Sequence, residues 1–234
     1  MLSTRFKEDS IIEIGVDEAG RGSFWGPLMA GALIVPEEAI WTEKHRELLS
    51  QLRDSKKITP KKRNKLYDEI KELIPQTAVG IVSAEEINEK GINWANIEAF
   101  RRAIYGLGME DITKCRVLID GILQIDKWDG EQELIIEGDG KYLAIAGASI
   151  LAKVEHDRWI QNYCKEYPEC NEKYDMLSCN GYGTEKHRNG IKIYGGHKLH
   201  RTLYIQKWLP GSSHTVKTKN KNTNTNTNKF LIKI

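Results

Sequence analysis

An acidic pair, Asp17-Glu18, ends an apolar run and directly precedes a glycine-rich turn, Gly20-Arg21-Gly22. Two further acids close expected strands: Asp120 follows Val-Leu-Ile, and Asp139 closes a third strand region, where it lies between two glycines. Because α/β proteins place their sites at the carboxyl ends of strands, we expect these four acids to converge. Buried carboxylates are costly unless cations compensate them, and their oxygens favour hard ions such as Mg²⁺ or Mn²⁺. The pattern predicts a two-metal site for phosphoryl chemistry, with an exposed Asp-Glu turn as the plainer alternative for the first pair.

Short apolar runs and helical patterns surround these acids. The first two runs flank the glycine-rich turn, which predicts a β-hairpin. The expected strands are Ile11–Val16, Leu28–Val35, Thr77–Val82, Arg116–Ile119 and Leu134–Ile136. The expected helices start after Thr59 and after Ser83, which both have capping signals, and cover Asn93–Leu107, Leu143–Tyr163, Thr184–Ile193 and His200–Trp208. Strands mixed with helices predict the α/β class, with about five strands and a helical C-terminal portion.

The composition is that of an ordinary globular protein, with 40% hydrophobic and 29% charged residues. No apolar run approaches the ~20 residues needed to cross a bilayer. The segment Met1–Ser10 is charged and lacks an apolar signal core, so we expect a cytoplasmic protein with no membrane association. The four cysteines form no CxxC pair, so we expect reduced thiols; the alternative is a zinc site built from Cys164, Cys170, Cys179 and His156.

The composition changes after Pro210, where Asn and Thr alternate over Asn222–Asn228. Such low-complexity polar sequence cannot bury enough apolar surface to fold. We therefore expect one catalytic domain over residues 1–210 and a disordered Asn/Thr/Lys-rich tail over residues 211–234. The tail holds five lysines and no acid, whereas the whole chain has a net charge of +2, so residues 1–210 carry a net charge of −3. Nucleic-acid binding by such a body requires local basic patches or bound metal ions.

The tail lysines predict a contribution to non-specific nucleic-acid affinity. Truncation after Pro210 should weaken the binding of duplex and reduce its dependence on salt, because fewer phosphate contacts release fewer counterions. Binding titrations over a range of salt concentrations measure this slope. An unchanged slope in the truncated protein would rule out the contribution.

Four segments resemble the signature motifs of the type 2 ribonuclease H (ribonuclease HII) family, and they occur in the family's order. Asp17–Gly22 is similar to the family's opening motif, and Asp54–Thr59 to its Asp-Ser-Lys-Lys segment. Gly138-Asp139 with Ile145–Val154 resembles the long internal motif, and Gly181–Thr184 resembles the C-terminal motif. The resemblance covers roughly residues 11 to 205, which makes it far more specific than a lone acidic pair.

The resemblance implies an RNase H-like fold with a mixed central sheet flanked by helices. It also implies an endoribonuclease that cuts the RNA strand of RNA/DNA hybrids and incises 5′ of ribonucleotides embedded in duplex DNA. Asp17, Glu18, Asp120 and Asp139 would be the catalytic acids and would hold two Mg²⁺ or Mn²⁺ ions astride the scissile phosphate. Hydrolysis would leave a 5′-phosphate and a 3′-hydroxyl, with no side-chain nucleophile. The implied roles are removal of misincorporated ribonucleotides and of RNA primers, by a protein that we expect to be a monomer.

Substrate contacts are also implied by the resemblance. In the family, the Gly-Arg-Gly turn and a tyrosine read the ribose 2′-hydroxyl, which distinguishes RNA from DNA, and these roles would fall on Gly20–Gly22 and Tyr182. Lys56, Ser149 and Lys153 are candidates for phosphate contact. The plainer alternatives are a solvated helix start for Lys56, a surface lysine for Lys153, a packed small residue for Ser149 and a half-buried ring for Tyr182.

Three positions depart from the family pattern without touching the four acids: Ile122, Gly147 and His156. Type 3 ribonuclease H shares the acids but lacks the arginine of the Gly-Arg-Gly turn and carries a sizeable N-terminal domain, whereas ten residues precede the first strand here. A junction resolvase would not need the elements that read a 2′-hydroxyl. A non-catalytic binding subunit is the alternative from a different class, and four clustered acids argue against it because they repel an anionic duplex.

Overall fold

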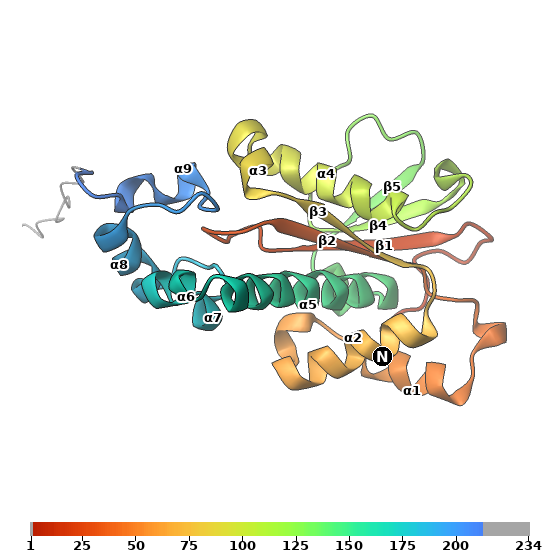
Figure 1. Cartoon of the computed structure of the whole chain (residues 1–234). Helices are drawn as coiled ribbons and strands as arrows, with labels where there is room; N and C mark the ends of the chain where they lie inside the picture. The colour runs from red at the N-terminus through yellow and green to blue at the C-terminus, as the bar shows by residue number, and fades with distance from the viewer. Residues whose placement is uncertain (1, 213–234) are drawn as a thin grey trace, which may run out of the picture.

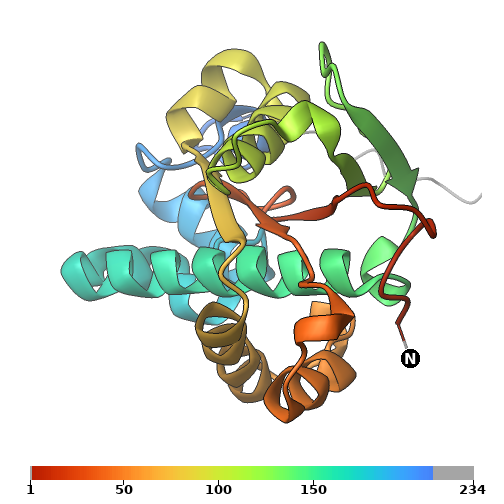
Figure 2. The same ribbon diagram turned by 90° about the vertical axis from the view of Figure 1, so that its right-hand side faces the viewer.

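The computed structural model describes residues 2–212, which form one β-sheet with helices on both faces (Figures 1 and 2). The sheet is mixed and five-stranded, with the order β3-β2-β1-β4-β5. Its strands are β1 (Glu13–Ala19), β2 (Leu28–Leu33), β3 (Thr77–Val82), β4 (Arg116–Asp120) and β5 (Glu131–Ile135). This confirms the expected α/β class, the mixed sheet and its five strands. The expected tail lies outside the described residues except for Gly211 and Ser212.

The pairing of β1 decides where its acids point. It runs antiparallel to β2, so the expected hairpin across the glycine-rich turn is confirmed. On its other side β1 runs parallel to β4, with Val16 opposite Ile119. Parallel strands end at the same edge of a sheet, and residues in register point to the same face. The carboxyl ends of β1 and β4 are therefore neighbours.

Two helices cover the faces of the sheet (Figure 1). The helix α4 (Ile92–Tyr105) packs on one face, where Ala95, Ala99, Phe100 and Ala103 are buried with the apolar side chains of β1, β2 and β4. The helix α5 (Leu143–Glu166) packs on the other face and is longer than expected by three residues. Every residue from Leu143 to Ala152 is buried, because this part of α5 lies between the sheet and two further helices.

The approach of α5 to the sheet depends on glycine. A Cβ atom on Gly15 would lie 2.2 Å from the Ala144 carbonyl carbon, and one on Gly31 would lie 2.2 Å from the Ala148 carbonyl oxygen. Both distances are far below van der Waals contact, so β1 and β2 accept α5 only where they have no side chain. Gly147, a departure from the family pattern, has the same explanation from the helix side: its Cβ would lie 2.5 Å from a methyl carbon of Leu33.

The remaining helices lie beside α5, beside α4 or in the C-terminal region (Figure 1). Next to the first half of α5 are α1 (Glu43–Gln51) and α2 (Pro60–Leu73), and a short α3 (Ala84–Lys90) precedes α4. The predicted caps of α2 and α3 are present, at Thr59 and Ser83. The C-terminal region is helical, as expected, with α6 (Pro168–Tyr174), α7 (Met176–Cys179), α8 (Glu185–Tyr194) and α9 (Thr202–Ile205). These helices share a second apolar core that contains Trp25, Ile160 and Met176.

The sequence patterns missed three helices. Thr42 caps α1 through a capping box whose third residue is His45 instead of the usual acid or amide, so the signal was absent. The helices α6 and α7 lie in the polar stretch after α5 and have only seven and four residues.

Among the described residues, no helix combines the length and apolar character needed to span a membrane.

We predict that Gly31→Ala destabilises the fold by about 1–3 kcal/mol or more, because its methyl group would overlap the α5 backbone and force the helix off the sheet. Chemical denaturation followed by circular dichroism measures the loss. The matched control is Gly140→Ala, where a Cβ meets no atom within 4 Å. Equal stability of the two variants would show that α5 can shift at little cost.

Candidate active site

Three of the four predicted acids converge at the shared edge of β1 and β4. Asp17 and Asp120 each follow the paired residues Val16 and Ile119 by one position, and both point to the α5 side of the sheet. Asp139 arrives from a 3₁₀ turn, Gly138–Gly140, which leads into α5. Each of the three side chains offers one oxygen such that these atoms all lie within 4.8 Å of one another. The expected convergence is therefore present for these three acids.

The route by which Asp139 reaches this cluster differs from expectation. We predicted that it closes a strand, but β5 ends at Ile135, and Asp139 lies four residues later in the 3₁₀ turn. This turn is fixed to β4 because the Gly138 amide donates a hydrogen bond of 2.7 Å to Asp120 Oδ1. The left-handed backbone of Glu137 (φ 54°) opens the turn and redirects the chain toward the cluster.

Glu18 lies on the opposite face of β1, because successive residues of a strand alternate. Its carboxylate accepts a 3.5 Å hydrogen bond from the Asn96 amide on α4. The same Asn96 accepts a 2.7 Å hydrogen bond from Arg21. The acidic pair therefore spans the edge of the sheet, with Asp17 on the α5 side and Glu18 on the α4 side.

The cluster concentrates negative charge in a buried place. Burial raises the pKa of Asp17 well above its usual range, and the nearby carboxylates Glu18 and Asp120 raise it further. Burial and the charge of Asp120 raise the pKa of Asp139 to about 6. Burial also raises the pKa of Glu18, against the lowering effect of the Arg21 guanidinium. Keeping these buried carboxyl groups ionised costs free energy, and a divalent cation bound among them would offset that cost.

Lys56 is a positively charged side chain close to the acidic cluster. It lies in a 3₁₀ turn, Ser55–Lys57, whose start is fixed by a 2.9 Å hydrogen bond from the Lys56 amide to the Asp54 carboxylate. Burial alone would lower the pKa of Lys56, but the negative charges of Asp17 and Asp139 outweigh it and raise the pKa. The side chain is therefore held as a cation near the acidic cluster.

The cluster opens into a pocket of about 410 Å³. All seven residues predicted to contact substrate line this pocket, together with two of the predicted acids. The lining residues are Asp17, Glu18, Ala19, Gly20, Arg21, Gly22, Ser55, Lys56, Ser149, Lys153 and Tyr182. Four separate segments of the chain thus meet at one place, although nothing but their motif resemblance connected them in the sequence.

Two walls of this pocket lie next to each other. The first is the turn after β1, in which Gly20 adopts the positive φ of +83° that favours glycine. The second is Tyr182, whose backbone forms a β-bridge to Ser23. A Cβ on Gly22 would lie 3.8 Å from the Tyr182 ring, so the turn and the ring are in contact distance.

The helix α5 supplies the third side of the pocket. The hydroxyl groups of Ser149 and Ser55 share a hydrogen bond of 2.8 Å, and the Ser149 hydroxyl beside Asp17 partly offsets the raised pKa of that acid. Lys153 lies one turn further along α5, 5.4 Å from the centre of the Tyr182 ring, and forms a 2.8 Å ion pair with Asp157. Ser55 also lines the pocket, and the sequence analysis did not predict it as a site residue.

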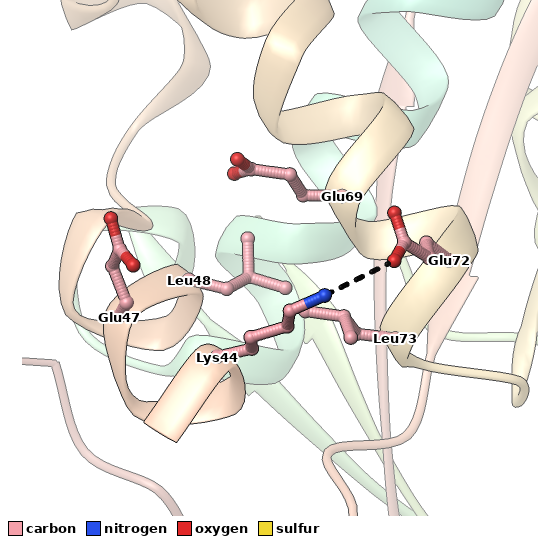
Figure 3. A pocket seen from close by; sticks show the side chains of 6 residues that line it. All are labelled: Lys44, Glu47, Leu48, Glu69, Glu72 and Leu73. Carbon is pink, nitrogen blue, oxygen red and sulfur yellow. Dashed lines mark ion pairs between the residues drawn. The ribbon is translucent and has the colours of Figure 1, made fainter. Parts of the chain in front are cut away.

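A second hollow lies between α1 and α2 and has different chemistry. It measures about 170 Å³ and is lined by Lys44, Glu47, Leu48, Glu69, Glu72 and Leu73 (Figure 3). Its only lysine pairs with Glu72 at 3.8 Å. None of the predicted site residues lines it, so the pocket beside the acidic cluster is the candidate active site.

The alternative zinc site is not formed. Cys164, Cys170 and Cys179 are buried and free, and they belong to the C-terminal apolar core. Within residues 2–212, Asp17, Asp120 and Asp139 converge closely enough to hold a metal ion, and no group of three cysteines and histidines does. His156 is fully buried beside the glycine-rich turn, with its Nε2 atom 3.5 Å from the Ser23 hydroxyl.

Comparison with known proteins agrees with this geometry. The family model described as Ribonuclease HII matches residues 14–207. A ribonuclease HII of Fusobacterium nucleatum is 40% identical over 206 residues, which cover 87% of this chain and 90% of the relative. The crystal structure of ribonuclease H2 from Pyrococcus horikoshii superimposes with a TM-score of 0.66 at 26% identity and covers 85% of this chain and 97% of that one. The RNase HII of Archaeoglobus fulgidus, solved in a complex with PCNA, gives a TM-score of 0.64 at 25% identity over 83% of this chain and 94% of that chain.

A mixed sheet with a carboxylate cluster at its edge, in a fold shared with these enzymes, defines a divalent-metal-dependent nuclease of the RNase H type. The chain belongs to the ribonuclease HII family, and it is a ribonuclease H endonuclease that acts on nucleic acid.

The buried charge predicts a pH-dependent stability. Because the pKa of Asp17 is raised in the folded state, wild-type protein in EDTA loses stability as the pH rises from about 4 through that pKa. Asp17→Asn should therefore raise the unfolding temperature in EDTA at pH 8, by roughly 2–4 °C for each kcal/mol recovered, and the gain should vanish near pH 4. Thermal unfolding at several pH values measures it.

The control for this prediction is the exposed Asp129→Asn, which should change the unfolding temperature little at either pH. Addition of Mn²⁺ should stabilise the wild-type protein more than Asp17→Asn. A variant Asp17→Asn that is less stable than wild type in EDTA at pH 8 would contradict the assignment of a charge burial cost to this site.

Proposed function

We propose that this protein hydrolyses the RNA strand of RNA/DNA hybrids and incises duplex DNA on the 5′ side of embedded ribonucleotides, leaving a 5′-phosphate and a 3′-hydroxyl. The observation that carries the proposal is the pocket in which the acidic cluster, the glycine-rich turn and Tyr182 meet. The cluster suits phosphodiester hydrolysis, and the two facing walls suit recognition of a sugar. Such an activity serves the removal of misincorporated ribonucleotides and RNA primers.

The carboxylates fit a pair of divalent cations. Three carboxylate oxygens within 4.8 Å of one another form an all-oxygen donor set, which favours Mg²⁺ or Mn²⁺ over softer metals. Asp17, Asp120 and Asp139 would hold the ions, and Glu18 would complete the set from the other face of β1. When bound, the ions lower the pKa of the attacking water and neutralise the charge that develops on the leaving 3′-oxygen.

The protein's own side chains orient the phosphate. Lys56 is cationic and lines the pocket beside the acids, which suits a contact to a non-bridging phosphate oxygen. Ser149 and Lys153 line the same pocket from α5 and are the further candidates for phosphate contact. The ion pair of Lys153 with Asp157 restrains the ammonium group beside the Tyr182 ring, which reduces the entropy lost when a phosphate binds.

Ribose recognition is assigned to the two facing walls. The turn Gly20–Gly22 has glycine at both ends, so its backbone can come close to a sugar without a clash from a side chain. Arg21 is held on the α4 side, near Glu18, by its hydrogen bonds to Asn93 and Asn96 on α4, at 2.8 and 2.7 Å. Tyr182 faces the turn and offers both a ring and a hydroxyl to the sugar. A 2′-hydroxyl between these walls would distinguish a ribonucleotide from a deoxyribonucleotide.

The domain assignment and the cellular setting are part of the same proposal. Residues 1–210 form the catalytic domain, since the described elements end with a 3₁₀ turn at Gln206–Trp208, and residues 211–234 form the tail. We place the protein in the cytoplasm. We also propose a monomer, because one chain supplies both the acidic cluster and the residues that line the pocket.

The proposal is tested by incision of a labelled DNA duplex with one embedded ribonucleotide, in Mg²⁺ and in EDTA, beside an all-DNA duplex and a full RNA/DNA hybrid. Metal-dependent cutting on the 5′ side of the single ribonucleotide supports it. Cutting of the hybrid alone would keep the metal site and remove the sensor assignment of Gly20–Gly22 and Tyr182. Cutting of neither substrate would contradict the proposal.

We expect Asp17→Asn and Asp120→Asn to lower kcat by a factor of about 10³ or more, because each removes charge at the centre of the proposed metal site. Steady-state incision assays with Mg²⁺ measure this loss. Circular dichroism should show an unchanged fold, and the exposed Asp129→Asn should keep wild-type activity. Retained turnover in either active-site variant would refute the assignment of that acid.

A further inference from the structure

Arg201 binds the backbone of the glycine-rich turn and does not itself line the pocket. Its side chain is 1% exposed, and its five N–H donors make five hydrogen bonds to backbone carbonyls. The acceptors are the carbonyl oxygens of Gly20 (2.7 Å), Arg21 (3.0 Å), Gly26 (3.2 and 3.1 Å) and Pro27 (2.8 Å). These residues begin and end the loop between β1 and β2, so one guanidinium group fixes both of its ends.

No carboxylate among residues 2–212 forms an ion pair with Arg201, so the carbonyl dipoles of the loop are its partners. Burial lowers its pKa to about 10, which still leaves the group charged at neutral pH. A lysine here would offer three donors from one point, where the arginine offers five in a planar fork. The observed contacts therefore depend on arginine itself and not on positive charge alone.

The preceding residue, His200, is connected to the opposite wall of the pocket. The His197 amide donates to His200 Nδ1 at 2.7 Å, so Nδ1 of His200 is an acceptor and its proton is on Nε2. That proton is donated to Nε2 of His187 at 2.9 Å. His187 then carries its own proton on Nδ1 and donates it to the Tyr182 carbonyl oxygen at 2.9 Å.

This chain of hydrogen bonds needs both rings neutral, since a second proton on either ring would put two donors face to face. Burial lowers the pKa of His200 to about 3 and lowers that of His187 as well, so both are neutral near pH 7. Both side chains are at most 1% exposed. The donor order is thus fixed along the whole path to Tyr182.

We propose that the dipeptide His200-Arg201 is a positioning element that fixes the two walls of the pocket relative to each other. Arg201 acts through the turn Gly20–Gly22, and His200 acts through His187 and Tyr182. The inference rests on the proposed function, because it concerns the walls assigned to ribose recognition. Neither His200 nor Arg201 lines the pocket, so both act through the residues that do. Additional contacts join the same segments: Trp25 forms a β-bridge to His200, and the Phe24 carbonyl accepts from the Arg201 amide at 2.7 Å.

A purely structural role predicts different consequences. Loss of a stabilising contact would lower the amount of folded enzyme and affect every substrate equally. Loss of register between the walls would instead affect only the reaction that uses a 2′-hydroxyl, because phosphate contacts along the duplex do not depend on it. The acidic cluster is held by β1, β4 and the 3₁₀ turn Gly138–Gly140, so metal binding should not change either.

The experiment uses full-length protein with Mg²⁺ and the variants Arg201→Lys and His200→Asn. Asparagine keeps an acceptor for the His197 amide, but it has no donor at the position of the histidine Nε2 atom that bonds His187. It is the milder variant if Arg201→Lys does not fold. Arg46→Lys is the matched control, since Arg46 is 52% exposed, contacts Glu38 and Trp41 at the surface, and does not line the pocket. The measurements are kcat and KM on a duplex with one ribonucleotide, Ki of the all-DNA duplex as a competitor, the unfolding temperature, and Mn²⁺ affinity by calorimetry.

We expect each variant to lower kcat on the ribonucleotide duplex at least 10-fold, while Ki for the all-DNA duplex and the Mn²⁺ affinity stay within about 2-fold of wild type. Arg46→Lys should match wild type in every measurement. Folded variants with wild-type kcat would overturn the proposal, and so would a parallel loss of kcat, all-DNA binding and metal affinity. A wild-type enzyme that does not incise at the ribonucleotide would overturn the proposed function first, which separates the two failures.

A double-mutant cycle tests the path through His187. If His200 acts through Tyr182, then Tyr182→Ala removes the group on which it acts, and His200→Asn should lower kcat by less than 2-fold in that background. Arg201→Lys should still lower kcat there, because it acts through the other wall. Fully additive losses of kcat for His200→Asn and Tyr182→Ala would overturn the path through His187. The role of Arg201 would then be decided by the result for Arg201→Lys.

Discussion

Three carboxylates within 4.8 Å of one another form the constraint on which the rest of this structure depends. Like charges at this distance repel, and burial adds a cost that raises the pKa of Asp17 and Asp139. The fold holds them together by ordinary means: the parallel register of β1 with β4 brings Asp17 and Asp120 side by side, and the Gly138 amide fixes Asp120. The mixed sheet matters here because an antiparallel neighbour would have placed its carboxyl end at the opposite edge.

The approach of α5 completes the site. Because Gly15 and Gly31 have no side chains, the helix backbone lies directly on β1 and β2, and its residues reach the same edge of the sheet as the acids. Ser149 touches Asp17 for this reason, and Lys153 comes beside Tyr182 one turn later. A helix held further away by side chains would have left the acids without their third wall. Glycine in the strands therefore serves function through packing.

Much of this arrangement could be predicted from local sequence. The hairpin, the caps at Thr59 and Ser83, and the strand ends at Asp17 and Asp120 have signals within a few residues. The helix α1 was missed because its capping box uses His45, and Asp139 was assigned to a strand end because a left-handed residue, Glu137, redirects the chain in a way that periodicity does not record. The contacts of Arg201 were out of reach, since they join residues more than 170 positions apart and use backbone acceptors, which have no residue type.

The two halves of the pocket are built by different physical means. The acids lie on a sheet whose ladder of hydrogen bonds fixes them, whereas the loop Gly20–Pro27 has a single internal backbone hydrogen bond, Ser23 to Gly20, within its turn. A glycine-rich loop can approach a sugar closely, but it has large conformational entropy and needs restraint from elsewhere. The buried guanidinium group of Arg201 supplies that restraint without a side chain in the pocket. The C-terminal helical region is therefore part of the site's construction, although of its residues only Tyr182 lines the pocket.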